Sequence, residues 1–258
     1  MRTLKNLIVK ANYIGIVVLV SSSFLFIQSC KSDKKSTQVE TVTEAKENVI
    51  EIITENMDFQ MPDTIPSGWN TFRYKNQSPQ THFFLVDKYP EGKTSEDAEK
   101  VIGPVFDSAM KLIMEGKTEE GYAEFAKLPE WFSEVVFVGG SGLLSPDQVG
   151  ETTINLKPGK YIIECYVKMS NGVFHTSMGM AKDIVVTPAD SGNKELIADI
   201  AINISSTDGI VFNDSISSGK HVFSVFYNDQ IVHENFVGHD INLVKLDENA
   251  NLEELEIW

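Results

Sequence analysis

Cysteine and basic residues are both scarce in this sequence of 258 residues. Only two cysteines are present, Cys30 and Cys165, so a disulfide-rich scaffold is excluded. Lysine and arginine number 22 against 37 aspartates and glutamates, which gives a formal net charge of -15. Such a charge opposes binding of nucleic acid or of an anionic membrane surface by the folded part, because phosphates would be repelled.

Recognisable enzyme motifs are also lacking. The chain contains no phosphate-binding loop, no nucleophile elbow and no zinc-binding helix motif, so no small-molecule substrate is predicted. Hydrophobic residues make up 42% of the chain and charged residues 23%, which is the composition of a chain that buries a core. We therefore expect a folded protein that is not an enzyme.

The first 29 residues are typical of a targeting segment, with basic residues ahead of an apolar stretch. The stretch ends at Ser29 and Cys30, which resemble the lipobox of bacterial lipoproteins, although Gln28 departs from the usual small residue. The resemblance implies a signal peptide over 1–29 and lipidation of Cys30. It also implies a membrane-anchored protein of the cell envelope, facing the periplasm or the exterior. The alternative is an uncleaved anchor helix, for which the interrupted apolar run is short.

A polar tether leads into a region with strand character. Residues 30–48 are almost wholly polar and lack apolar periodicity, so they cannot offset their own ordering entropy. From 49 to 188, short runs with strand character alternate with turn residues, which predicts an antiparallel β-sandwich. The runs cover 49–54, 70–74, 82–87, 135–138, 151–156, 160–168 and 181–187, with turns expected at 66–68 and 157–159.

Residues 95–132 interrupt these strands with a helical pattern. Apolar residues, among them Val101, Ala109 and Ile113, recur at helical spacing. The pattern predicts two short amphipathic helices that end near Pro129. We expect their apolar residues to pack against the sheets rather than to form a ligand pocket, because an amphipathic helix needs a surface on which to bury one face.

Residues 195–258 repeat the beginning of the domain. The segment 65–72 matches 216–223, and each copy continues to an asparagine and then to a histidine: Asn76 and His82 in the first copy, Asn228 and His239 in the second. This partial second repeat has too few strands to bury a sheet face alone, so either it packs on the first domain or the chain continues. Because no cysteine accompanies them, we interpret His221, His233 and His239 as structural or surface residues.

One run of residues carries donor atoms suited to a metal ion. A predicted strand reaches Cys165, and His175 and Met180 follow beyond a loop. Thiolate and imidazole ligands in one plane, with a thioether as a long axial ligand, make up a type 1 copper site. A second imidazole must come from elsewhere in the chain, and His82, which opens an earlier strand, is the candidate.

The region 49–188 resembles the cupredoxins, the family of blue copper proteins. In that family an early histidine follows a strand end that bears an asparagine. A cysteine, a histidine and a methionine then follow in that order near the carboxyl end. These places are occupied here by His82 after Asn76 and by Cys165, His175 and Met180. The resemblance implies a Greek-key β-sandwich that binds one type 1 copper ion.

The ligand loop and the helical insertion depart from the family pattern. The loop between Cys165 and His175 is longer than in the smallest members and nearer that of nitrite-reductase-like cupredoxin domains, and the insertion is atypical. Met178 competes with Met180 as the axial ligand. We favour Met180 because its spacing from His175 is the commoner one, and we expect Met178 to face the core.

Three strong ligands and one weak ligand leave no open coordination position for a substrate. We therefore expect one-electron transfer by a membrane-anchored protein outside the cytoplasm, with a redox partner protein that supplies and receives electrons. Two alternatives stay open. One is a copper-free binding or assembly module, and the other is copper storage or delivery, for which the nearby methionines are few.

Overall fold

The computed structural model describes residues 48–212, 215–231 and 239–251. The targeting segment, the lipidation site at Cys30 and His233 lie outside the described residues. Within them, no helix combines the length and the apolar character needed to cross a membrane.

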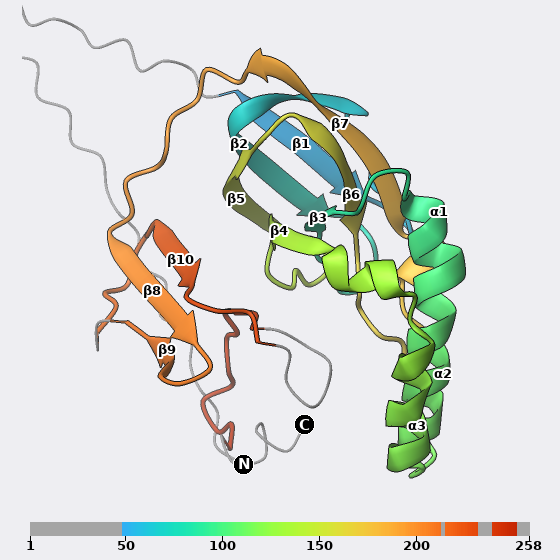
Figure 1. Cartoon of the computed structure of the whole chain (residues 1–258). Helices are drawn as coiled ribbons and strands as arrows, with labels where there is room; N and C mark the ends of the chain where they lie inside the picture. The colour runs from blue at the N-terminus through green and yellow to red at the C-terminus, as the bar shows by residue number, and fades with distance from the viewer. Residues whose placement is uncertain (1–47, 213–214, 232–238, 252–258) are drawn as a thin grey trace, which may run out of the picture. The chain divides into compact units, whose positions relative to one another are not determined.

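A single long strand, β2 (Thr64–Asn76), takes part in both sheets of the main domain (Figure 1). Its later residues pair in parallel with β1 (Val49–Thr54) and antiparallel with β5 (Val149–Leu156). Its first residues pair in parallel with β7 (Ala181–Asp190), and the register shifts between Pro66 and Ser67. A strand that changes sheet through such a bend forms the corner of a sandwich.

Two expectations about this region are wrong in detail. The sheets are mixed rather than purely antiparallel, because β2 runs parallel to both β1 and β7. The expected turn at 66–68 lies inside β2: the bulge after Pro66 and the positive φ of Gly68, 89°, bend the strand without ending it.

The second sheet carries the strand that ends beside Cys165. Its order continues from β7 through β6 (Gly159–Glu164) and β3 (Leu85–Lys88) to β4 (Val136–Gly140), with antiparallel pairing throughout. The turn at 157–159 connects β5 to β6, which lie in different sheets. The strand expected over 82–87 begins at Leu85, and His82 forms only an isolated bridge with Leu144.

The main hydrophobic core lies between the two sheets. Alternate residues of β6 point into it, Tyr161 and Ile163, followed by Cys165 just beyond the strand. Three aromatic side chains fill its centre: the Phe72 and Phe84 rings lie 5.5 Å apart between centroids, and Tyr74 meets Phe84 edge-on at 5.5 Å. Cys165 and Met180 belong to the same buried cluster, so the core itself places two of the predicted ligands.

The helical insertion contacts the outer face of the second sheet through its two ends. It comprises α1 (Ser95–Asp97), a π-helical turn at Ala98–Ile102, α2 (Gly103–Met114) and α3 (Thr118–Glu124), followed by two 3-10 segments that end at Glu134. Two helical stretches are thereby confirmed, but α2 and α3 pack mainly on each other, and it is the two ends of the insertion that pack on the sheet. A second cluster of buried residues forms beneath them, with Ala98 against Tyr89 and Ile162.

The π turn changes which residues of the insertion face inward. Val101, expected in the buried stripe, is 40% exposed, whereas Ile102 is 2% exposed. A π turn adds a residue to the helical repeat and so rotates the following side chains around the axis. A regular 3.6-residue pattern could not reveal this shift.

A smaller sheet is built from residues of the predicted partial repeat. It has the order β10 (Phe223–Tyr227), β8 (Ile200–Ser205), β9 (Gly209–Val211). β8 and β10 run parallel, as β1 and β2 do, and Asn228 donates a backbone hydrogen bond to Ile204 much as Gln77 does to Thr54.

Gly140→Ala should destabilise the domain by roughly 1–3 kcal/mol, because the added Cβ would lie 2.1 Å from the backbone oxygen of Phe84 and force β3 and β4 apart. Gly150→Ala is the matched control, since its Cβ would contact only the movable side chain of Leu144, at 3.2 Å. Urea unfolding of both variants measures the difference. Equal stabilities would contradict the β3–β4 packing described here.

Candidate metal centre

Three of the predicted ligands, His82, Cys165 and His175, meet at one buried point; we call these three side chains the metal group. The Nδ1 atoms of His82 and His175 lie 3.1 Å apart, and they lie 3.8 and 3.6 Å respectively from Sγ of Cys165. All three side chains are fully buried. Residues separated by up to 93 positions in the sequence thus present two imidazole nitrogens and one sulfur to the same small space.

Asn76, at the end of β2, organises the loop that carries His82. Its buried side-chain amide donates to the backbone oxygens of Gln80 and Leu144, at 2.7 and 2.8 Å, and its oxygen accepts the backbone N–H of Ser78 at 3.1 Å. The hydroxyl of Ser78 lies 3.0 Å from Nε2 of His82. This contact at the far side of the ring leaves Nδ1 directed toward Cys165.

The other ligands are fixed by backbone hydrogen bonds around the end of β6. The oxygen of Cys165 accepts both the backbone N–H and the hydroxyl of Thr176, each at 3.0 Å. Met180 donates its N–H to the oxygen of His175 at 3.0 Å, and Cys165 donates to the oxygen of Met180 at 3.3 Å. The loop therefore closes on itself immediately around Cys165.

Two candidate axial methionines occupy different environments. Met178 was expected to face the core, but 47% of it is exposed, because it ends a single 3-10 turn on the surface. Met180 is fully buried in the cluster that contains Cys165. Burial beside the cysteine favours Met180, whose role as a ligand stays a prediction.

Burial keeps all three donors neutral in the metal-free protein. It lowers the pKa of His82 to about 4, with a further contribution from the charge of His175, and it lowers the pKa of His175 as well. Burial raises the pKa of the Cys165 thiol to about 11. A metal ion must therefore displace the thiol proton when it binds, and neither imidazole competes by carrying a positive charge.

The donor triangle has the dimensions that a transition metal needs. A point in the plane of the three atoms lies about 2.0 Å from each of them, close to the roughly 2.0–2.3 Å at which imidazole nitrogen and thiolate sulfur bind a metal such as zinc. Two imidazoles and one thiolate in a trigonal plane make up the strong-ligand set of type 1 copper. These are three of the four ligands that the resemblance to the cupredoxins predicts.

Comparison with known proteins gives the following likenesses. No protein-family model matches the chain, and no curated protein sequence matches it. Among solved structures, the chain is similar to an auracyanin from Roseiflexus castenholzii, at 24% identity over 54% of this chain and 97% of that chain, with a TM-score of 0.34. Auracyanin A, a "blue" copper protein from Chloroflexus aurantiacus, is 22% identical over 54% of this chain and 98% of that chain, with a TM-score of 0.32. Rusticyanin from Thiobacillus ferrooxidans is 15% identical over 54% of this chain and 76% of that chain, with a TM-score of 0.31.

A buried acid pair on the outer face of the second sheet was not predicted. Asp87 and Glu164 are fully buried beneath the helical insertion, and Tyr166 donates its hydroxyl to Asp87 at 3.3 Å. Burial raises the pKa of both carboxyl groups, and the charge of Glu164 adds to the rise at Asp87. The only sequence signal is the position of Glu164 directly before Cys165, which places its side chain on the opposite face of the strand.

The described histidines of the partial repeat form no metal group. His221 Nδ1 lies 2.6 Å from Asp199, and His239 Nε2 lies 3.2 Å from Asp229. Among the described residues, the cluster of His82, Cys165 and His175 is the one group of three such donors within reach of a single ion. Their interpretation as structural or surface residues stays a prediction.

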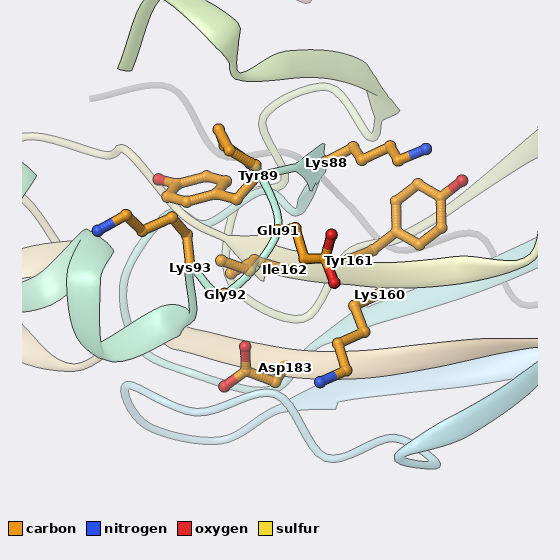
Figure 2. A pocket seen from close by; sticks show the side chains of 10 residues that line it. Lys88, Tyr89, Glu91, Gly92, Lys93, Lys160, Tyr161, Ile162 and Asp183 are labelled. Atoms are coloured by element: carbon orange, nitrogen blue, oxygen red, sulfur yellow. The ribbon is translucent and has the colours of Figure 1, made fainter. Parts of the chain in front are cut away.

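A hollow of about 300 Å³ lies apart from the metal group (Figure 2). Three lysines and two carboxylates stand around it together with two tyrosines, so it carries charges of both signs. None of the metal-group residues lines it; the lining is Lys88, Tyr89, Pro90, Glu91, Gly92, Lys93, Lys160, Tyr161, Ile162 and Asp183.

The metal-free protein should lose stability in acid because of His82. The unfolded chain takes up a proton near pH 6.5, whereas the folded protein resists protonation until about pH 4. The contribution of His82 to the free energy of unfolding is therefore fully present above pH 6.5. It falls by roughly 2–3 kcal/mol as the pH is lowered toward 4.

Urea unfolding of the metal-free protein between pH 4 and 7 tests this prediction. His82→Gln should flatten the dependence of stability on pH. His221→Gln should leave the loss in place, because Asp199 raises the pKa of His221 rather than lowering it. An unchanged acid loss in His82→Gln would contradict the assigned cause.

Proposed function

We propose that this protein carries single electrons through one type 1 copper ion held by His82, Cys165, His175 and Met180. The convergence of two imidazole Nδ1 atoms on one buried thiol, with sides of 3.1, 3.6 and 3.8 Å, carries the proposal. A bound copper ion would supply a reversible one-electron change between Cu(II) and Cu(I). The residues around it supply a soft ligand set that accommodates both states.

The surroundings of the ligands favour electron transfer over catalysis. The three strong donors are fully buried, and hydrogen bonds join the loops on which they lie. The same arrangement of donors can therefore persist in both oxidation states of the copper ion. With Met180 as a fourth, weak ligand, no coordination position faces a substrate. Electrons must then come from and go to a partner protein, and the net charge of -15 favours a partner with a basic docking surface.

We further propose that the protein acts at a membrane outside the cytoplasm, held by a lipid on Cys30. The lipobox-like end of the targeting segment supports the anchor, and the polar residues 30–48 would let the domain reach a partner. Acylation of Cys30 in cells, followed by mass spectrometry of the mature amino terminus, tests this part independently of copper. An unmodified Cys30 would contradict it.

The partial second repeat supports a second, copper-independent role in assembly. Its parallel β8–β10 pair resembles the β1–β2 pair, yet the repeat lacks a cysteine with which to form its own metal group. Deletion of residues 195–258 should leave copper binding intact while reducing capture of a partner protein. His82→Ala should abolish copper binding and leave capture of the partner unchanged.

Protein that lacks residues 1–30 should bind one Cu(II) and turn blue, because the thiolate of Cys165 transfers charge to the metal. Cys165→Ser should remove the colour, since the serine hydroxyl is not a comparable donor. Optical absorption during copper titration is the measurement. A colourless wild-type protein whose thiol can still be titrated would end the proposal.

Met180→Leu should keep the blue colour but raise the reduction potential, because loss of the weak thioether ligand destabilises Cu(II) more than Cu(I). Met178→Ala is the matched control, since that side chain is exposed, and it should change nothing. Voltammetry of the copper-loaded variants measures the potential. A shift in Met178→Ala but not in Met180→Leu would exchange the two assignments.

A further inference from the structure

Met169 contacts the outer edge of the metal group. Its Sδ atom lies 3.2 Å from Nε2 of His175, on the side of the ring opposite the Nδ1 atom that faces Cys165. His175 is fully buried although it stands in a loop, and Met169 itself is only partly buried. The methionine thus lies between the imidazole and the surface.

The chemistry of this contact fixes where the ring proton resides. A thioether sulfur carries no hydrogen and can only accept a hydrogen bond, so Nε2 of His175 must be the donor. In a neutral imidazole the other nitrogen, Nδ1, then carries a lone pair. That lone pair is directed at the space it shares with His82 and Cys165.

We propose that Met169 is a positioning residue that holds His175 in the metal-binding tautomer and shields its outer edge from water. The first part concerns the metal-free protein alone. The second part rests on the proposed function, because its consequence for electron transfer requires bound copper. Hydrogen bonds from the non-binding nitrogen of a ligand histidine orient the ring in metal sites generally, usually to a carboxylate, a carbonyl or water.

A short hairpin holds Met169 in place. The N–H of Met169 donates to the oxygen of Val173 at 2.8 Å, and the N–H of Gly172 donates back to Met169 at 2.9 Å. His175 donates to the oxygen of Val167 at 2.9 Å, which closes the hairpin next to the metal group. The long loop between Cys165 and His175 is therefore an ordered cover.

Helix α2 supports the hairpin from the outside. Asp107 accepts the backbone N–H of Phe174 at 2.9 Å, and the rings of Phe174 and Phe106 pack edge to face at 6.0 Å between centroids. A Cβ added at Gly172 would lie 3.2 Å from the sulfur of Met114, so the turn of the hairpin approaches the end of the helix closely. Helix α2 thus braces the hairpin that carries Met169.

Three substitutions separate the two effects of Met169. Met169→Ala removes both the cover and the acceptor, Met169→Leu keeps the cover without an acceptor, and Met169→Gln restores an acceptor of similar length. Met178→Ala is the control, because it removes an exposed methionine three residues beyond His175. All four are made in protein that lacks residues 1–30.

Two readouts use metal-free protein. Nitrogen-15 NMR of the His175 ring should show a proton on Nε2 in the wild type and in Met169→Gln, and a mixture of tautomers in Met169→Leu. Labelling of the Cys165 thiol by a water-soluble maleimide should be about tenfold faster in Met169→Ala than in the wild type, with Met169→Leu near the wild-type rate. Met178→Ala should match the wild type in both measurements.

A third readout uses copper-loaded protein. Opening the site to water favours the more highly charged Cu(II) state, so Met169→Ala should shift the equilibrium about tenfold toward Cu(II), a fall in potential of about 59 mV for one electron. The inference would be overturned if Met169→Ala and Met169→Leu both kept the His175 tautomer, the Cys165 labelling rate and the reduction potential of the wild type. If the protein binds no copper, the proposed function fails, while the two metal-free readouts still decide the role of Met169.

Discussion

The metal group depends on the pairing of β6 with β3 and β7. That pairing buries the strand between two layers and directs Cys165 inward at its end, where backbone hydrogen bonds from Thr176 and to Met180 tie the following loop around it. The loop after β2 brings His82 to the same point because Asn76 fixes its course. The three donors are therefore buried, and hydrogen bonds of the loops that carry them fix their arrangement.

The two faces of β6 have opposite character. One face contributes Cys165 to the metal group, and the other buries Glu164 against Asp87 under the helical insertion. Because burial raises the pKa of both carboxyl groups, the pair brings less negative charge to the back of the site than two ordinary carboxylates would. The insertion therefore does more than cover an apolar face: it seals a polar cluster on one side and supports the ligand hairpin through Asp107 on the other.

Local pattern was enough to find most strands of the main domain, the two helical stretches and three residues that meet at one point, because residue type and spacing directly encode periodicity and donor chemistry. His82, Cys165 and His175 were predicted to converge, and they do. Features set by three-dimensional packing were out of reach: the exposure of Met178, the rotation of Val101 by a π turn, and the acid pair. The contact of Met169 with His175 was also out of reach, since nothing in the local sequence indicates that the hairpin folds its sulfur onto His175.

The passage of β2 through both sheets has a consequence for how the chain acquires its structure. Thr64 pairs with Val185, so the sandwich corner joins residues separated by more than a hundred positions, and the loop between Cys165 and His175 lies inside the segment that this contact closes. Closing so long a segment is entropically expensive before any contact within it is gained, and β-rich topologies of this kind fold over milliseconds to seconds. A nascent chain cannot complete the corner until the last strand of the domain is available. Because β7 follows His82, Cys165 and His175 in the chain, the corner is completed only after all three of these residues have been synthesised.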